Sequence, residues 1–417
     1  MNASRLPGRI EGAAHDPGMP ARVDSNLCIH HLDSVEDLER VRDEWDGFVE
    51  QSGSDIYFTV DWLQAWWSHY GRGRTFRGFI ARNGGQMVGA LPFSVQRVWA
   101  GPVPVRLAKF VGADSTLPVF TPAIAEGFEE PVVRVILESL FVDVDCDAVS
   151  LSPLSGLSPV AEVAELVVND AFQLLRSDSP GKHTVFHLPP SFGDYLQGLS
   201  SSQRQIHRRY LRKLNSRHEI SFRTITGVEA IAYFDRFAEL HAAYWRQRGK
   251  LGHFGDWPAG TEFNRDLIAR MASTGRARFY EVSGDSRVLA IEYCFVLGDR
   301  CYWRLPARDP DPELEELRLG RVSLAEMFRM LIETGHRMVE GGPGHYDYKL
   351  RLGAEEYSLR RIVIGGPSAR ARWRTAVLVR WADLLQLVYY RGWFLKVRPR
   401  LGLRPRPLKR SWIVTRL

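Results

Sequence analysis

The amino-acid sequence predicts a mixed α/β (α+β) protein made of two halves of one plan, with mostly antiparallel sheets flanked by helices. The chain has 417 residues, which is long for a single core and suits two domains. A hydrophobic content of 45% with 25% charged residues is typical of a globular protein. One order of elements, helices followed by hairpins of strands, occurs twice along the chain.

The first half is predicted to begin with helices and to continue into a hairpin. Residues 34–50 and 59–71 space their apolar side chains as amphipathic helices do. Two apolar runs flank residues 83–85, Asn-Gly-Gly, which is typical of a tight turn between antiparallel strands. After a stretch rich in Pro and Gly, residues 129–141 predict a helix and residues 147–154 a short strand.

The second half repeats this order around three central strands. Residues 277–307 predict three strands joined by turns at Gly284-Asp285 and Gly298-Asp299. Residues 317–335 predict a loop and a helix, and residues 345–356, which carry Asp347, Lys349 and Arg351 at alternate positions, are predicted to belong to the closing strands. Further helices are expected over residues 190–216, 227–249 and 260–275, and further strands over residues 219–225 and 358–366.

The termini differ in character from the body. Residues 1–26 are rich in Gly, Pro and Ala and lack the apolar core of a secretory signal, so we interpret them as a disordered lead-in. No run of 18 or more uncharged apolar residues predicts a membrane-spanning helix. The four cysteines show no spacing of metal ligands, which favours reduced thiols in a cytoplasmic protein without a metal.

Residues 367–417 predict a basic amphipathic tail. From Ser368 onward thirteen Arg and Lys residues accompany one acid, Asp383, so the body carries no excess positive charge and no nucleic-acid partner is expected. Trp373 and Trp381 begin an apolar stripe at helical spacing among these arginines. This pattern suits the surface of an anionic membrane, and the alternative is a helix docked on the body, which suits the first turns better than the end rich in Pro and Arg.

Several residues of the second half occur in an order that resembles a known family. Glu340, Gly344, Tyr348 and Lys349 precede the stretch LRLGA, and Asp309 and Gly320 flank the start of a helix, with Leu319 where proline is usual. A basic helix, QIHRRYLRKL, lies upstream. Over about residues 189–364 the chain resembles the GNAT-superfamily acyltransferases of the BioF2-like or cellulose-biosynthesis CelD group, relatives of the FemAB transferases.

The resemblance implies a tandem GNAT-like fold. A degenerate domain would span residues 27–182 and an acyltransferase domain residues 183–366. The implied activity is transfer of an acyl group from acyl-CoA, such as acetyl-CoA, to an amine or hydroxyl. The implied acceptor is a small-molecule or lipid-linked saccharide, or an envelope or exopolysaccharide precursor, at the inner face of the membrane.

The family also implies where the co-substrate binds. In GNAT folds the pyrophosphate lies on backbone N–H groups at the start of a helix. Gly320 would allow close approach, Arg318 and Arg321 would reach phosphate, and Ser323 would cap the helix. The alternative is an ordinary capped helix with solvated arginines.

Catalytic candidates come from the strands. Glu292 lies in an apolar strand, where burial would raise its pKa toward that of a general base, and an ion pair is the alternative. Trp303 is expected on the same face of the sheet. Tyr348 and Lys349 would orient the substrate or pair with Glu340 across a glycine turn, and the alternative is a structural ion pair.

Candidate acceptor contacts follow the long helix of the second half. Arg248 and His253 lie just past its periodic stretch, in a loop rich in Gly and aromatic residues, and Asp309 and Trp303 complete the predicted set. Two other functions stay open at this point. One is a FemAB-like aminoacyl transferase that uses charged tRNA, and the other is a catalytically silent partner of a polysaccharide-synthesis complex.

Overall fold

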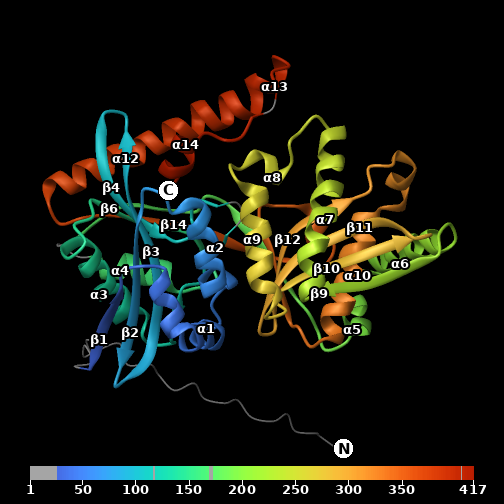
Figure 1. Cartoon of the computed structure of the whole chain (residues 1–417), viewed down its shortest axis with the longest axis horizontal. Coiled ribbons are helices and arrows are strands. Elements are labelled where there is room, and N and C mark those ends of the chain that lie inside the picture. The colour runs from blue at the N-terminus through green and yellow to red at the C-terminus, as the bar shows by residue number, and fades with distance from the viewer. Residues whose placement is uncertain (1–25, 116–117, 169–171, 405) are drawn as a thin grey trace, which may run out of the picture.

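The computed structural model describes residues 26–115, 118–168, 172–404 and 406–417. Nearly all of the predicted lead-in, residues 1–26, lies outside this part of the chain. The strands form one sheet in the order β1-β2-β3-β4-β6-β14-β8-β13-β12-β11-β10-β9 (Figure 1), with β5 and β7 paired at its side. The strands of the first half are β1 Leu27–Leu32, β2 Thr75–Asn83, β3 Gln86–Ala100, β4 Val103–Phe110, β5 Ala123–Ile124, β6 Ala148–Ser155 and β7 Gln173–Asp178.

The second half supplies the rest of the sheet. Its strands are β8 Lys182–His187, β9 Ile220–Thr226, β10 Ala277–Gly284, β11 Arg287–Leu297, β12 Arg300–Arg308, β13 Met338–Pro343 and β14 Glu355–Gly365. Its helices are α5 Phe192–Gly198, α6 Ser201–Asn215, α7 Val228–Gln247, α8 His253–Asp256, α9 Gly260–Ala272, η3 Pro312–Leu317, α10 Leu319–Glu333 and α11 Asp347–Leu350. The first half contributes η1 Glu36–Val41, α1 Arg42–Gln51, η2 Ile56–Phe58, α2 Val60–Tyr70, α3 Glu129–Val142 and α4 Val160–Val167.

The two halves share one topology. In each, antiparallel strands lead to a parallel pair, β4 with β6 in the first half and β12 with β13 in the second. The first half is completed by a strand of the second half, because β14 pairs with β6, whereas β8 pairs with β13 within the second half. Since β14 also pairs with β8, the two sheets join into one. The predicted fold class, with two halves of similar plan, is confirmed.

The alternation of side chains along the strands fixes which helices cover each face of the second half. Phe279 and Tyr293 belong to the core that includes α7 and α9, whereas Tyr280 and Cys294 pack with α10 on the opposite face. The first of these cores continues into the first half, where α2 packs on α9 (Figure 1). The halves therefore share a hydrophobic core.

Some sequence predictions fail for identifiable reasons. Residues 345–356 are not one strand, because Asp347–Leu350 form the single helical turn α11 and β14 begins only at Glu355. The alternate charges of Asp347, Lys349 and Arg351 therefore do not share a strand face. The strand β4 was not predicted because Pro102 and Pro104 are typical of loops, yet Pro104 lies at the end of the strand, opposite Trp99.

The tail docks on the body through its first helix and through its C-terminal end. It forms α12 Ala369–Leu385, the π-helix η4 Gln386–Val397, α13 Arg398–Arg400 and α14 Arg410–Thr415. Leu378 and Leu417 are buried against strands of the first half, and Trp412 is buried near Trp257. The expectation that the end rich in Pro and Arg does not dock is wrong, because carbonyl oxygens of this end accept hydrogen bonds from the buried Lys109.

Candidate active site

The parallel strands β12 and β13 separate after a short contact. They pair only from Arg300 to Tyr302 on β12 and from Met338 to Glu340 on β13. Beyond this point β12 continues to Arg308 and β13 to Pro343 without pairing between them. Backbone groups on the facing edges of the two strands are thereby released from the sheet, and side chains from α10 and α11 gather beside them.

Lys349 occupies the place where the strands separate. Its Nζ donates a hydrogen bond to the carbonyl oxygen of Gly341 at 2.6 Å and lies 5.4 Å from the ring centre of Trp303 and 4.6 Å from that of Tyr346. The residue is only 4% exposed. Burial lowers the pKa of Lys349 to about 8, and the nearby Glu340 carboxylate opposes this effect. A buried ammonium group with a lowered pKa thus lies at the splayed edge.

Glu292 is buried and has three hydrogen-bond donors. It accepts hydrogen bonds from Trp303 Nε1 at 2.9 Å, from Arg308 at 2.5 Å and from Ser323 Oγ at 2.5 Å. Burial raises its pKa above the ordinary value, while Arg308 opposes the rise. The general-base prediction assumed an unpaired carboxylate. Instead, the ion pair that was considered as the alternative is present, with Arg308 as the partner. The three bonds join β11, β12 and the first turns of α10.

The start of α10 has the backbone geometry expected of an anion site. Arg318 precedes the helix in the left-handed conformation, φ 51°, and makes no side-chain cap. Gly320 lies against the Arg308 guanidinium, since a Cβ atom there would be 3.1 Å from Arg308 Nε. Arg321 donates to the carbonyl oxygen of Gln203 at 3.2 Å. The predicted N-cap role of Ser323 is wrong, because Ser323 lies inside the helix and donates to Glu292.

Tyr348 and Glu340 both precede Lys349 along the chain and have different surroundings. Tyr348 is 46% exposed, and its pKa is raised by burial and by the charge of Glu292. Glu340 accepts a hydrogen bond from Gly342 N–H at 2.9 Å and pairs with His183 Nδ1 at 3.1 Å. His183 Nε2 in turn lies 3.2 Å from Ser155 Oγ, so this buried chain links the two halves. No local sequence pattern indicates this chain of bonds, because its members come from three strands that are distant along the sequence.

Two of the predicted acceptor residues form ion pairs away from the separated strands. Arg248 donates to Glu315 at 3.0 Å and stacks on the ring of Tyr244, 3.7 Å from its centre. Asp309 receives two hydrogen bonds of 2.6 Å from Arg287. These contacts hold loops in place, whereas Trp303 and His253 lie at the candidate site.

His253 lines a narrow cleft between the halves. Its interior of about 10 Å³ has room for about one water molecule. The cleft begins where the parallel pairing ends, since Arg304 and Leu305 of β12 form one wall. The remaining lining residues are Tyr70, Ser115, Phe254, Trp257, Gly260, Phe263 and Asn264.

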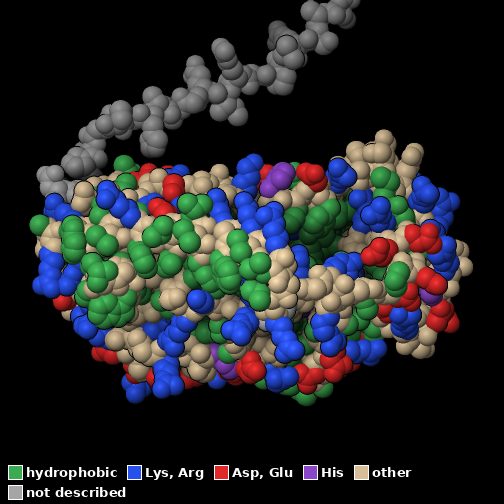
Figure 2. Space-filling model, turned by 90° about the horizontal axis from the view of Figure 1, so that it is seen from above, with side chains coloured by type: hydrophobic (Ala, Val, Ile, Leu, Met, Phe, Trp, Pro, Cys, Tyr) green, Lys and Arg blue, Asp and Glu red, His purple; other side chains and the backbone are tan. Residues whose placement is uncertain are grey.

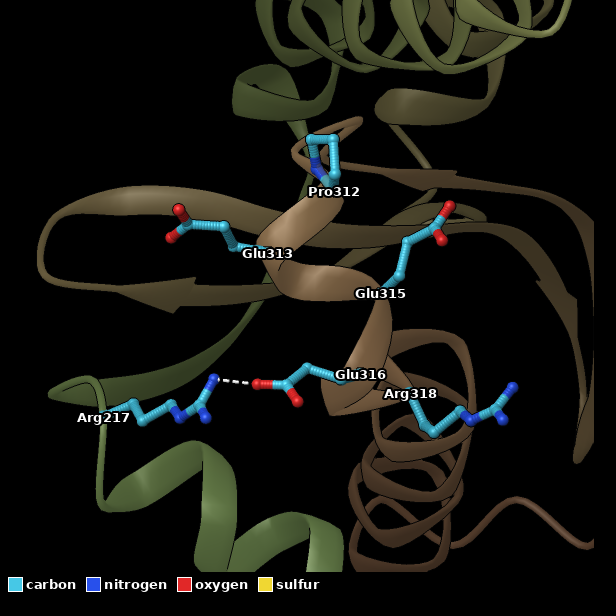
Figure 3. Close-up of a pocket in the computed structure, with 6 residues that line it drawn as sticks. All are labelled: Arg217, Pro312, Glu313, Glu315, Glu316 and Arg318. Carbon is cyan, nitrogen blue, oxygen red and sulfur yellow. Dashed lines mark hydrogen bonds and ion pairs between the residues drawn. The ribbon is translucent and has the colours of Figure 1, made fainter.

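A larger, open depression of about 660 Å³ lies on the outer side of η3 (Figure 3). Arg217 and Glu316 point toward each other across it, whereas Glu315 and Arg318 point away from them. Arg318 is the only predicted site residue in its lining. The depression therefore borders the start of α10 and contains none of the predicted catalytic groups.

Comparison with known proteins agrees with this geometry. Residues 201–350 match the family model of an acetyltransferase (GNAT) domain. A crystal structure of FemX superposes with a TM-score of 0.58 at 10% identity, covering 83% of this chain and 98% of that one. The structure of L-PGS from Bacillus licheniformis superposes with a TM-score of 0.48 at 10% identity, covering 81% of this chain and 96% of that one. A tandem GNAT protein from the clavulanic acid biosynthesis pathway superposes with a TM-score of 0.41 at 12% identity, covering 82% of this chain and 99% of that one. No curated protein sequence matches the chain.

The domain match covers the elements that build the site. Residues 201–350 begin with α6, contain the separated strands and α10, and end in α11 beside Lys349. Within the described residues no cluster of potential metal ligands occurs, and no helix is long and apolar enough to cross a membrane. Residues 201–350 of the second half therefore match an acetyltransferase (GNAT) domain, and this match confirms the prediction of an acyltransferase.

Proposed function

We propose that the protein transfers an acyl group from acyl-CoA to an acceptor at the cell envelope, with the chemistry in the second half. The pyrophosphate of CoA would lie on the uncapped backbone N–H groups at the start of α10. Arg318 and Arg321 would complete its charge neutralisation. Gly320 supports this placement, because it has no Cβ atom and its backbone lies directly against the Arg308 guanidinium.

The observation that carries the proposal is the buried amine of Lys349 at the separated strands. A thioester placed along the free edge of β12 would bring its carbonyl oxygen toward this amine. As an ammonium ion, Lys349 would stabilise the negative charge that develops on that oxygen during attack, and a water-poor site strengthens such stabilisation. Glu292 then acts as a positioning residue, since it holds Arg308, Ser323 and Trp303 in place. Tyr348, half exposed beside them, would contact the substrate.

The test separates donor binding from chemistry. Acetyl-CoA and longer acyl-CoAs should raise the Tm of the parent protein, because a ligand that binds the folded state stabilises it. Lys349→Met should keep this Tm shift, and its turnover should fall at least about 100-fold. Lys349→Arg should retain part of the turnover. Lys182→Met, which removes an exposed lysine paired with Glu356, is the matched control. Equal turnover in Lys349→Met and the control would reject the role of Lys349.

The acceptor is proposed to be a saccharide or envelope precursor that is linked to lipid. The sequence resemblance to the CelD group supports the saccharide, and the tail supports the membrane. Exposed apolar side chains concentrate on η4 and its neighbours, beside exposed arginines (Figure 2). They are Trp373, Leu384, Leu387, Val388, Trp393, Leu395, Val397, Leu401 and Leu403. Such a surface fits the interface of an anionic bilayer, and each basic residue there contributes about 1 kcal/mol.

Point substitutions test this surface, because deletion of the docked tail would also expose core residues. Leu387→Glu should reduce sedimentation of the protein with phosphatidylglycerol vesicles, while Leu166→Glu, which alters an exposed leucine on α4, should not. Binding should weaken at high salt and on phosphatidylcholine vesicles. Equal vesicle binding by both variants would refute membrane docking through η4.

The FemX likeness favours a second candidate, aminoacyl transfer from charged tRNA. On α6, Arg208 and Arg212 are exposed on one basic face that could meet an RNA backbone. Binding measured with acyl-CoA and with aminoacyl-tRNA in parallel distinguishes the two donors. If neither binds, the remaining candidate is a catalytically silent partner of a polysaccharide-synthesis complex.

A further inference from the structure

His253, which lines the narrow cleft between the halves, is paired with His241 behind it, and a backbone carbonyl fixes the proton positions of the pair. His241 on α7 is 1% exposed, and its Nδ1 lies 2.8 Å from the carbonyl oxygen of Pro306. A carbonyl oxygen only accepts hydrogen bonds, so Nδ1 of His241 carries the proton. In the neutral ring Nε2 is then a bare acceptor. His253 Nδ1 lies 3.4 Å from it and donates to it.

This chain of bonds leaves a lone pair at the cleft. Because His253 uses its Nδ1 proton toward His241, the neutral ring of His253 has an unprotonated Nε2. Burial lowers the pKa of both histidines to about 4, and the charge of Arg304 contributes at His253. Both rings are therefore neutral at physiological pH. The arrangement follows the logic of a base that is oriented by a third group.

The lining of the cleft indicates which kind of nucleophile it admits. Among its described lining residues Arg304 is a cation and none is an acid. An ammonium group would be repelled there, whereas a neutral hydroxyl could donate to His253 and accept from the second N–H of Asn264. The small volume admits one such group of an acceptor and no whole sugar ring.

The position of the cleft matches the proposed donor site. Arg304 and Leu305 belong to β12 immediately after its pairing with β13 ends, and Lys349 lies 5.4 Å from the ring of the adjacent Trp303, which packs on the α10 side of the sheet. The outer wall is the C-terminal segment, since Trp257 packs on Leu408 and Trp412. An acceptor that arrives at η4 would therefore reach the cleft beside this segment and insert one group.

We propose that this cleft receives a hydroxyl group of the acceptor and that His253 is its general base, so that the protein is an O-acyltransferase. The inference rests on the proposed function and deepens it. His253 Nε2 takes the hydroxyl proton while the oxygen forms a bond to the thioester carbonyl carbon. The carbon–sulfur bond then breaks, and the proton passes to the departing thiolate, which gives an ester and free CoA thiol. His241 is a positioning residue.

The experiment follows release of CoA thiol from acetyl-CoA, with water, methyl glucoside or its 6-amino-6-deoxy analogue as the acceptor. His253→Gln should lower the rate at least about 100-fold, within the range for loss of a general base. His241→Asn can still donate to the Pro306 carbonyl but cannot accept from His253 through a ring nitrogen, so it should lower kcat more than it changes KM. His218→Gln, which alters a histidine that precedes β9 and pairs with Asp285 in the turn after β10, is the control and should retain the parent rate.

The outcomes separate this inference from the proposed function. A parent protein whose Tm does not respond to acetyl-CoA would overturn the proposed function. If the parent binds acetyl-CoA but the His253→Gln variant releases thiol as fast as the parent, the role of His253 alone would be overturned. The same holds if the parent releases thiol equally fast with no acceptor. Products that resist hydroxylamine are amides, and a faster reaction of the amino sugar would overturn the hydroxyl preference.

Discussion

Glu292→Gln provides the sharpest test of how the site is held together. The substitution keeps the size of the side chain and removes its charge, while Arg308, Ser323 and Trp303 all donate to the carboxylate. Hydrogen bonds to a charged group contribute about 1.5–3 kcal/mol, against about 1 kcal/mol for neutral pairs. Breaking a buried ion pair by removal of one partner costs about 3–5 kcal/mol. Because an amide retains one acceptor oxygen, we expect a loss of about 3 kcal/mol in the free energy of unfolding.

Urea unfolding followed by circular dichroism measures this loss as a shift of the midpoint at constant slope. Ser323→Ala, which removes one of the three donors, should cost about 1 kcal/mol and serves as the matched control. Turnover of Glu292→Gln, measured where the variant is folded, should fall less than tenfold. An unchanged unfolding free energy together with a loss of 100-fold or more in kcat would refute this reasoning and identify Glu292 as the general base.

Three further predictions concern the donor site and the tail. The ammonium form of Lys349 is lost when the pH rises through its pKa of about 8, so kcat/KM should fall above pH 8. Lys349→Arg should remove this decline. A kcat/KM that rises through pH 8 would instead identify Lys349 as a base. Gly320→Ala, which places a Cβ atom 3.1 Å from Arg308, should raise the Kd for acetyl-CoA about tenfold in calorimetry with little change in Tm. Deletion of residues 409–417 should lower the Tm by at least about 5 °C in a thermal scan, because Trp412 and Ile413 are buried, whereas a detached membrane anchor would leave it unchanged.

The part of the fold set by local patterns was predictable from the sequence. The turns at residues 83–85, 284–285 and 298–299 connect strands as expected, and the start of α10 follows the predicted loop. Alternation of apolar residues and turn chemistry act over a few positions, so a single sequence reports them well. The pairing of β14 with β6, and of β8 with β13 and β14, joins segments that are distant along the chain, and no local pattern encodes it.

The candidate site shows the same division. Lys349, Tyr348 and Gly320 were found because they lie in short motifs, and the structure brings Glu292, Trp303 and Ser323 into contact as well. The partners of these residues were not predicted. Asp309 and Arg248 were assigned to the acceptor, but each pairs with an opposite charge that lies 22 and 67 positions away along the chain. The histidine pair was only half predicted, since His241 resembles any core residue of a helix.

The pairing of β14 with β6 has a consequence for synthesis on the ribosome. The first half finishes its own β7 at Asp178, but its sheet is completed only when β14 has been translated as far as Gly365, and its outer face only when Leu417 has emerged. At about 5–20 residues per second, the edge of β6 stays without its partner for on the order of ten seconds or more. An open strand edge of this kind favours association between nascent chains. Slow codons or premature termination in the second half would therefore damage the first half, although every residue of the first half had already been made.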